Sequence, residues 1–225
     1  MDFDKITPAT YELWIQDVNG CEFKKQLVIP KAPDPGVKLL PDLSSFTISL
    51  GDSLNLEARL PLGYPLNMVQ SVIWNPLEGL SFPDQTTLGL LTPTVHPTRD
   101  VEYTVKIVSI DECTAEDRVQ VKVDNEPHIY IPNAFSPWDA NGNNDKVLIF
   151  ADGDQVVRIN SFQIFDRWGE MVFQAHNFRP NDPAYGWDGR QQGRLMDPAV
   201  FAYYAEILMI DGRILLYKGD VTLVR

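Results

Sequence analysis

The chain has 225 residues, enough for one or two compact domains, and its 44% of apolar residues can supply a core. Its 31 acidic residues outnumber the 19 basic ones, and the resulting net charge of −12 argues against nucleic acid or an anionic membrane as the main partner. Two cysteines exclude a disulfide-framework miniprotein and a four-cysteine zinc site, while 17 prolines and 14 glycines favour short strands and turns.

The sequence carries no recognisable targeting or membrane-spanning segment. Residues 1–5 have neither the basic start nor the apolar run of a signal peptide. The longest apolar stretch, residues 199–210, contains Glu206 and falls short of the ~18 residues that a membrane-spanning helix needs. We therefore expect no direct insertion into a membrane.

A hairpin pattern occurs twice, 92 residues apart. Tyr11 and Cys21 coincide with Tyr103 and Cys113 after that shift. Apolar residues between and beyond these landmarks coincide as well: Leu13 with Val105, Ile15 with Ile107, Leu27 with Val119 and Ile29 with Val121. Apolar and polar residues alternate in both copies, which is the pattern of half-buried strands. Each copy predicts strand, turn and strand, with turns at residues 18–20 and 110–112.

The repeat has consequences for the two cysteines and for the first domain. Because Cys21 and Cys113 occupy equivalent places in successive copies, we expect no bridge between them and predict buried or semi-buried free thiols. A repeat of this length that ends near Lys31 would begin about 60 residues before Met1. We therefore expect residues 1–31 to be the last hairpin of a truncated repeat.

The apolar face of that hairpin would lack the sheet that normally covers it. It consists of Tyr11, Leu13, Ile15, Leu27 and Ile29. Exposed apolar faces of this size usually find a partner. We expect these side chains to pack against the neighbouring domain or a second chain, or to stay mobile.

Residues 36–125 are predicted to be a complete copy of the repeat. A linker with two prolines, residues 33–36, precedes it. Predicted strands follow at residues 46–50, 54–58, 69–74, 103–108 and 118–123, and this spacing indicates an all-β, Ig-like sandwich. Trp74 is expected in its core, on a central strand, in preference to a role as a ligand platform.

Three segments of this copy carry a family resemblance: residues 74–76 (WNP), residues 79–81 (GLS) and residues 103–105 (YTV), followed by Cys113. The pattern resembles the PKD-like/Ig-like repeats of large Bacteroidetes surface proteins. That resemblance implies a stalk or adhesive spacer.

The 92-residue pattern stops at Pro127, and short strands and turns continue to the end. Strands are predicted at residues 129–131, 147–150, 161–165, 171–173, 200–210, 213–218 and 219–225. Asp211-Gly212 suits a two-residue type I′ hairpin turn. The chain as a whole therefore predicts tandem Ig-like β-sandwich domains.

Several motifs occur in order over residues 127–225. They are residues 132–137 (PNAFSP), an Asn/Asp/Gly loop ending at Asp145, the turn Asp166, Arg167, Trp168, Gly169 and Glu170, the turn Gly186, Trp187, Asp188 and Gly189, an aromatic strand with Phe201, Tyr203 and Tyr204, and the ending from Gly219 to Arg225. This segment closely resembles the gliding-motility-associated C-terminal domain, the type B sorting domain of the type IX secretion system.

The resemblance implies a folded signal that directs cargo across the outer membrane. Its implied partners are the type IX translocon and an outer-membrane protein of the PorP/SprF-like kind. Candidate residues for translocon recognition are the two turns, from Asp166 to Gly169 and from Gly186 to Gly189, together with Arg225. The implied location is the cell surface or the medium.

The loop before Asp145 is also a candidate calcium site. Asp139, Asn141, Asn143 and Asp145 alternate as the oxygen ligands of a calcium loop do, with Gly142 available for the sharp bend. Phe150 stands where an EF-hand needs an acidic residue. The alternative is an Asx-rich turn whose side chains bond their own backbone.

Catalysis finds little support in the sequence. Asp166 and Asp188 could form an acid/base pair, but the chain has no nucleophile elbow, zinc-binding helix or phosphate loop. The alternative is that Asp188 caps its turn while Trp168 and Trp187 pack over the edge of the sandwich. We predict a non-enzymatic secretion signal and stalk, with an adhesive glycan- or protein-binding module as the rival; a hydrolase would need catalytic modules upstream.

Overall fold

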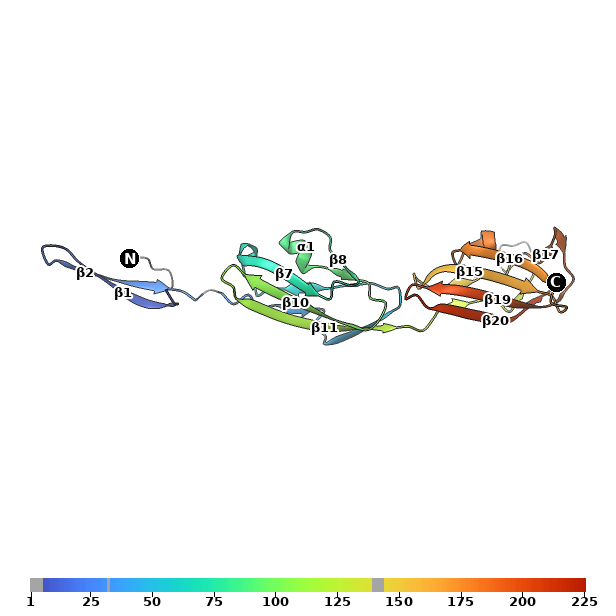
Figure 1. Ribbon diagram of the computed structural model, residues 1–225, viewed down its shortest axis with the longest axis horizontal. Coiled ribbons are helices and arrows are strands. Elements are labelled where there is room, and N and C mark those ends of the chain that lie inside the picture. Colours follow the sequence, from blue (N-terminus) through green and yellow to red (C-terminus); the bar gives the residue numbers. More distant parts are fainter. Residues whose placement is uncertain (1–5, 32, 139–143) are drawn as a thin grey trace.

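Three β structures follow one another along the long axis of the protein (Figure 1). The computed structural model describes residues 6–31, 33–138 and 144–225. A hairpin lies at one end, a sandwich of residues 37–124 follows, and a second sandwich of residues 129–224 carries the C-terminus at the opposite end. No helix in the described ranges is long and apolar enough to cross a membrane.

The N-terminal hairpin consists of β1 (Ala9–Gln16) and β2 (Glu22–Ile29). Tyr11 pairs with Leu27, as its equivalent Tyr103 pairs with Val119 in the next domain. Leu13, Ile15 and Leu27 are 43–51% exposed. Of the three alternatives expected for this face, packing against the neighbouring domain is therefore wrong, and the other two stay predictions.

The middle sandwich has a main sheet in the order β4-β11-β10-β7. These strands are β4 (Ser45–Ser49), β11 (Thr114–Asp124), β10 (Val101–Ser109) and β7 (Val69–Asn75). The first strand, β4, pairs parallel with the last, β11, whereas the other pairs are antiparallel.

A second layer of short strands faces the main sheet. It contains the pair β3 (Lys38–Leu40) and β6 (Glu57–Arg59), and the trio β5 (Leu54–Asn55), β9 (Thr94–Val95) and β8 (Leu80–Ser81). The 3₁₀ turn η1 (Leu66–Met68) and the short helix α1 (Thr87–Leu91) complete the domain. The strand predicted at 54–58 is split, because the Leu56 amide donates to Pro93 O and the pairing changes from β9 to β3 there.

The core between these layers follows from the alternation in the sequence. Tyr103, Val105 and Ile107 of β10 are fully buried. Trp74 is 4% exposed, and its indole N–H donates to Leu90 O at 2.8 Å, so its place in the core is confirmed. It lies on β7, however, which is an end strand of the main sheet and not a central one.

The C-terminal sandwich repeats this plan with one more strand. Its main sheet has the order β13-β20-β19-β15-β16, and β13 pairs parallel with β20 as β4 does with β11. The strands are β13 (Ala134–Phe135), β20 (Ile214–Leu223), β19 (Ala199–Met209), β15 (Val156–Phe165) and β16 (Met171–Phe178).

Short elements complete this domain: β12 (Ile129–Tyr130) with β14 (Phe150–Ala151), β17 (Arg190–Gln191) with β18 (Arg194–Leu195), and η2 (Pro183–Tyr185). The strand predicted at 147–150 forms only at its end. Val147 instead makes an isolated bridge with Trp187, which holds the loop before β14 against the core.

The terminal hairpins of the two sandwiches are equivalent, which the sequence pattern did not reveal. A shift of 100 residues carries β10–β11 onto β19–β20. Fully buried residues coincide after this shift: Val105 with Ala205, Ile107 with Ile207 and Val121 with Val221. The hairpin pattern thus occurs three times, although the cysteine of the first two copies is Arg213 in the third.

One five-residue turn recurs at residues 17–21, 109–113, 166–170 and 209–213. In each, the first residue's N–H donates to the fifth residue's carbonyl and the fourth residue's N–H to the first residue's carbonyl. The fourth residue has a positive φ in every case, for example 85° at Gly212. The type I′ turn predicted at Asp211-Gly212 is wrong, because that turn requires positive φ at both residues and Asp211 has none.

Both cysteines occupy the fifth position of this turn. Cys21 and Cys113 are free thiols, as expected from their equivalence. Both are exposed, however, so the prediction of buried or semi-buried side chains is wrong. The fifth residue stands where the turn ends and the second strand of the hairpin begins.

The hydroxyl of the buried Tyr103 makes a hydrogen bond within the middle domain. Its hydroxyl donates to Glu78 O at 2.9 Å. Burial raises the pKa of the Tyr103 phenol, and the charge of Glu78 raises it further. The fold therefore favours the neutral phenol, and this contribution is complete below the pKa of about 10 in the unfolded chain and is lost as pH rises through the folded value.

We expect Tyr103→Phe to lower the free energy of unfolding by about 1 kcal/mol at neutral pH, since one hydrogen bond is lost. The difference from the original chain should shrink above pH ~10, because only the original must lose a phenolic proton on unfolding. Urea denaturation at neutral and alkaline pH measures this, with the exposed Tyr130→Phe as a control. A difference that grows with pH would contradict the assignment.

Candidate functional site

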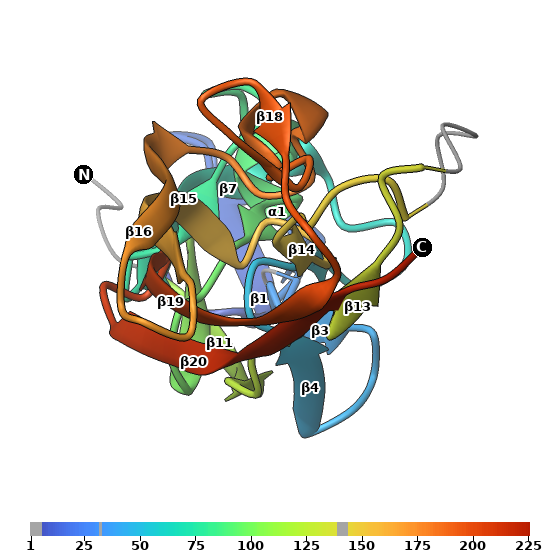
Figure 2. The same ribbon diagram turned by 90° about the vertical axis from the view of Figure 1, so that its right-hand side faces the viewer.

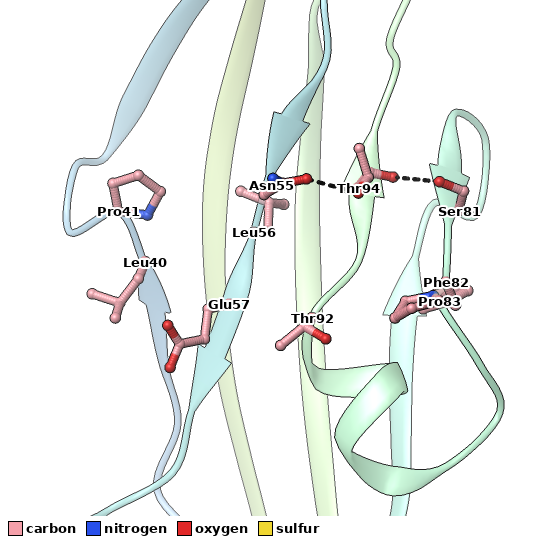
Figure 3. Close-up of a pocket in the computed structure, with 10 residues that line it drawn as sticks. All are labelled: Leu40, Pro41, Asn55, Leu56, Glu57, Ser81, Phe82, Pro83, Thr92 and Thr94. Carbon is pink, nitrogen blue, oxygen red and sulfur yellow. Dashed lines mark hydrogen bonds between the residues drawn. The ribbon is translucent and has the colours of Figure 1, made fainter.

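An open cleft lies across the second layer of the middle sandwich (Figure 3). Its volume is about 770 Å³. Leu40 and Pro41 form one side and Phe82 and Pro83 the other, with polar residues of the central strands between them. The cleft therefore has apolar margins and a mainly polar floor that also contains Leu56.

Hydrogen bonds hold the floor of this cleft in place. Thr94 Oγ1 donates to Asn55 Oδ1 at 2.7 Å, and Ser81 Oγ donates to Thr94 O at 3.3 Å. The Glu57 carboxylate accepts two bonds from the Arg59 guanidinium, at 3.0 and 3.2 Å. With that charge paired, the floor presents hydroxyl and amide groups of fixed orientation.

The turn at residues 166–170 joins β15 to β16 and is held by Asp166. Asp166 Oδ1 accepts the N–H groups of Trp168 and Glu170, both at 2.8 Å. Gly169 supplies the left-handed fourth position, with φ 81°. Trp168 is 86% exposed, and Arg167 is exposed beside it. The prediction that Trp168 packs over the sandwich edge is therefore wrong.

The turn at residues 186–189 has the opposite arrangement, because its tryptophan is in the core. Trp187 is 1% exposed, and its ring contacts Phe135 and Phe201, with centroid distances of 5.3 and 4.8 Å. Asp188 Oδ1 accepts the Arg190 N–H at 3.1 Å, so its expected capping role is confirmed.

Both glycines of this turn are needed for close packing. A Cβ on Gly186 would collide with the side chain of Leu148. At Gly189, where φ is 75°, a Cβ would lie 2.8 Å from Leu223 Cδ1. Because neither end of the turn has a side chain, its backbone can pack directly against the core.

The two turns meet at the end of the sandwich that faces away from the rest of the chain (Figure 1). Gln191, on the strand β17 that follows the second turn, donates from Nε2 to Glu170 Oε1 of the first turn at 2.7 Å and so links the two segments. A polar hollow of about 540 Å³ lies beside this bond, lined by Glu170, residues 191–192 and residues 194–196. We call this region, residues 166–170 and 186–196 together with Arg225, the distal end.

The C-terminus reaches the same end (Figure 2). The Val224 N–H donates to Phe135 O at 2.9 Å and continues the parallel pairing of β13 with β20. The Arg225 guanidinium lies over the ring of Trp138, 6.0 Å from its centroid, and both side chains are exposed. The distal end thus offers exposed tryptophan and arginine side chains on a rigid support.

Comparison with known families identifies the C-terminal sandwich. Residues 129–223 match the family described as the CHU_C type IX secretion signal domain. These residues are a type IX secretion signal domain. The domain implies interaction with the type IX machinery and export of the protein across the outer membrane, to the cell surface or the medium. The matched family is a secretion signal domain and not a catalytic family.

Other comparisons show only general likeness, and no curated protein matches the sequence. The chain is similar to fibronectin(III)-like modules of CbhA from Clostridium thermocellum, with 14% identity over 83% of this chain and 93% of that one (TM-score 0.29). It is similar to latent PorU from Porphyromonas gingivalis, with 11% identity over 95% of this chain but 23% of that one (TM-score 0.29).

A third similar structure is the N-terminal eight Ig domains of the Down syndrome cell adhesion molecule, with 11% identity over 96% of this chain and 30% of that one (TM-score 0.35). All three TM-scores are low. The fold described above therefore rests on the strands and sheets themselves.

The predicted calcium ligands and the predicted acid/base pair of the signal domain lie only partly within the described residues. Asp139, Asn141 and Asn143 lie outside the described residues, and Asp145 is half-buried, so calcium binding stays a prediction. Across the described ranges, no cluster of three or more His, Cys, Asp and Glu side chains could hold a metal ion. The Asp166 and Asp188 carboxylates both bind backbone amides of their own turns, which gives each a structural task.

Proposed function

We propose that the type IX translocon recognises this signal domain at its distal end, through an outer-membrane protein of the PorP/SprF-like kind. The observation that carries the proposal is the hydrogen bond between Gln191 and Glu170. It links the turn at residues 166–170 to the segment at residues 186–196. Residues that are far apart in the sequence thereby form one surface, on the side that the rest of the chain leaves open.

The candidate recognition residues divide into two groups by exposure. Asp166, Gly169, Gly186, Trp187, Asp188 and Gly189 shape the turns through their bonds, their close packing or their positive φ. Arg167, Trp168 and Arg225 are exposed and available to a partner. Because Trp and Arg contribute most strongly to protein interfaces, these three are the direct contacts in this proposal.

The wider organisation follows from the same proposal. In this proposal, residues 1–31 contribute a hairpin of the repeat type, residues 36–125 are a complete repeat that acts as a stalk, and residues 127–225 are the sorting domain. The chain itself performs no catalysis, which agrees with the structural tasks of Asp166 and Asp188.

Export of a reporter fused in front of the whole chain tests the recognition surface. We expect Trp168→Ala to reduce the exported fraction several-fold with an unchanged melting temperature, because its side chain is 86% exposed. Asp166→Ala should instead lower the melting temperature, because two backbone amides lose their acceptor.

The control for Trp168 is Trp14→Ala, which removes another exposed tryptophan, 58% exposed, from the N-terminal hairpin. Export of this variant should match the original chain. Normal export of both Trp168→Ala and Arg167→Ala would reject the distal end as the surface that is read.

A second candidate function is carbohydrate binding by the middle sandwich, and the cleft described above favours it. Sugars offer many hydroxyl groups and weakly apolar ring faces, and the cleft offers hydroxyl and amide groups between apolar margins. The bonds of Thr94 to Asn55 and Ser81 orient its floor before a ligand arrives. Such a module would make the exported protein an adhesin.

Glycan-array binding of the full chain tests this candidate. We expect Thr94→Val, which keeps the shape but removes the hydroxyl, to weaken binding by about 3- to 10-fold, as one or two lost hydrogen bonds would. Thr114→Val, at an exposed position of β11 away from the cleft, is the matched control. Binding that is absent, or unchanged in Thr94→Val, would contradict a carbohydrate site there.

The N-terminal hairpin supports a further partner, a second chain. The exposed Leu13, Ile15 and Leu27 form an apolar face that a second copy would cover. We expect light scattering to show a dimer whose fraction rises with concentration, and Leu13→Ser to remove it. A particle that stays monomeric at all concentrations would contradict this pairing.

A further inference from the structure

The middle sandwich contacts the signal domain at the end that lies opposite the distal end (Figure 1). The turn that follows β4, residues 49–52, carries Leu50 into the apolar cluster of the signal domain. Leu50 is 1% exposed and belongs to the same cluster as Val123 and Ile131. Its N–H donates to Asp124 O at 2.9 Å, which ties the turn to the last residue of β11, where the linker between the domains begins.

Gly51 lies directly against the backbone of the signal domain. With φ 91°, it has a conformation that residues with a side chain rarely adopt. A Cβ at this position would lie 2.8 Å from the Asp154 carbonyl carbon and 2.9 Å from Gln155 N. Since both are backbone atoms, no side-chain movement could make room.

The loop on the other side of the contact is fixed just as firmly. Gln155 is 2% exposed; its Oε1 accepts the His128 N–H at 3.1 Å, and its backbone O accepts the Ile210 N–H at 2.8 Å. Beside it, the Arg213 guanidinium donates to Asn125 O at 3.0 Å and pairs with Asp211. The linker is thus clamped by two turns of the signal domain.

We propose that the middle sandwich is a working part of the export signal, because its turn at residues 49–52 docks on the loop at residues 152–155 and holds the distal end pointing away from the cargo. Gly51 is the positioning residue of this docking. The inference rests on the proposed recognition at the distal end, since orientation matters only if that end is read. A signal domain on a free linker could turn its distal end back toward the cargo.

The test compares Gly51→Ala with Gly63→Ala in the full chain. Both glycines lie in turns with positive φ, 91° and 81°, so both variants bear similar backbone strain. Only Gly51 meets the signal domain, because a Cβ on Gly63 has nothing within 4 Å. Arg213→Gln, which removes the bond to the linker without touching either core, is a second variant.

Two measurements are made on each variant: domain tumbling by backbone ¹⁵N relaxation, and export of a reporter fused in front of the chain. We expect the two sandwiches to tumble together in the original chain and in Gly63→Ala, and separately in Gly51→Ala. We expect a several-fold loss of export in Gly51→Ala and a smaller loss in Arg213→Gln.

Independent tumbling of the domains in the original chain would overturn the docking itself. Separate tumbling with normal export in Gly51→Ala would overturn its role in export. These outcomes are distinct from failure of the distal-end proposal, which shows as normal export in both Trp168→Ala and Arg167→Ala while the two domains still tumble together.

Discussion

Each sandwich depends on the register of its long terminal hairpin, and a five-residue turn sets that register. Because side chains alternate along a strand, a slip of one residue would turn the buried face of the hairpin to solvent. The turns at residues 109–113 and 209–213 prevent the slip with two backbone bonds and a left-handed fourth residue. The first strand of each main sheet, β4 or β13, then adds parallel to the last and covers the outer edge of the hairpin.

The same turn explains why a signal can be displayed on a folded domain. At residues 166–170 the backbone is fixed by Asp166 and Gly169, so the side chains between them need not contribute to the fold. Trp168 is accordingly free to remain exposed. Rigid turns of this kind present side chains in one arrangement, which lowers the entropy lost when a partner binds. The stability of the turn and the identity of its exposed residues are therefore separate properties.

Local pattern was enough to predict the long strands, and distant contacts explain most of what it missed. Alternation located β10, β11 and β19, because it reflects the two faces of a single strand. It could not show that the strand predicted at 54–58 changes its pairing partner at Leu56, whose N–H donates to Pro93 O. Nor could it show that Val147 pairs with Trp187, forty residues later. Trp168 and Trp187 both occur in glycine-containing turns, and only the position of Phe135 and Phe201 decides which one is buried. The third hairpin copy lacks the cysteine landmark, because Arg213 stands in its place.

One short segment of chain, residues 49–55, contributes both to the contact between the two sandwiches and to the cleft of the middle domain. Gly51 touches the signal domain, and Asn55, on the strand β5 that follows, lines the cleft. Coupling between two sites requires an element with two arrangements that both sites can bias. This segment is instead bonded on both sides, at Leu50 to Asp124 and at Asn55 to Thr94. A ligand in the cleft would therefore find a fixed frame, and the segment connects cleft and signal domain as a spacer of constant length.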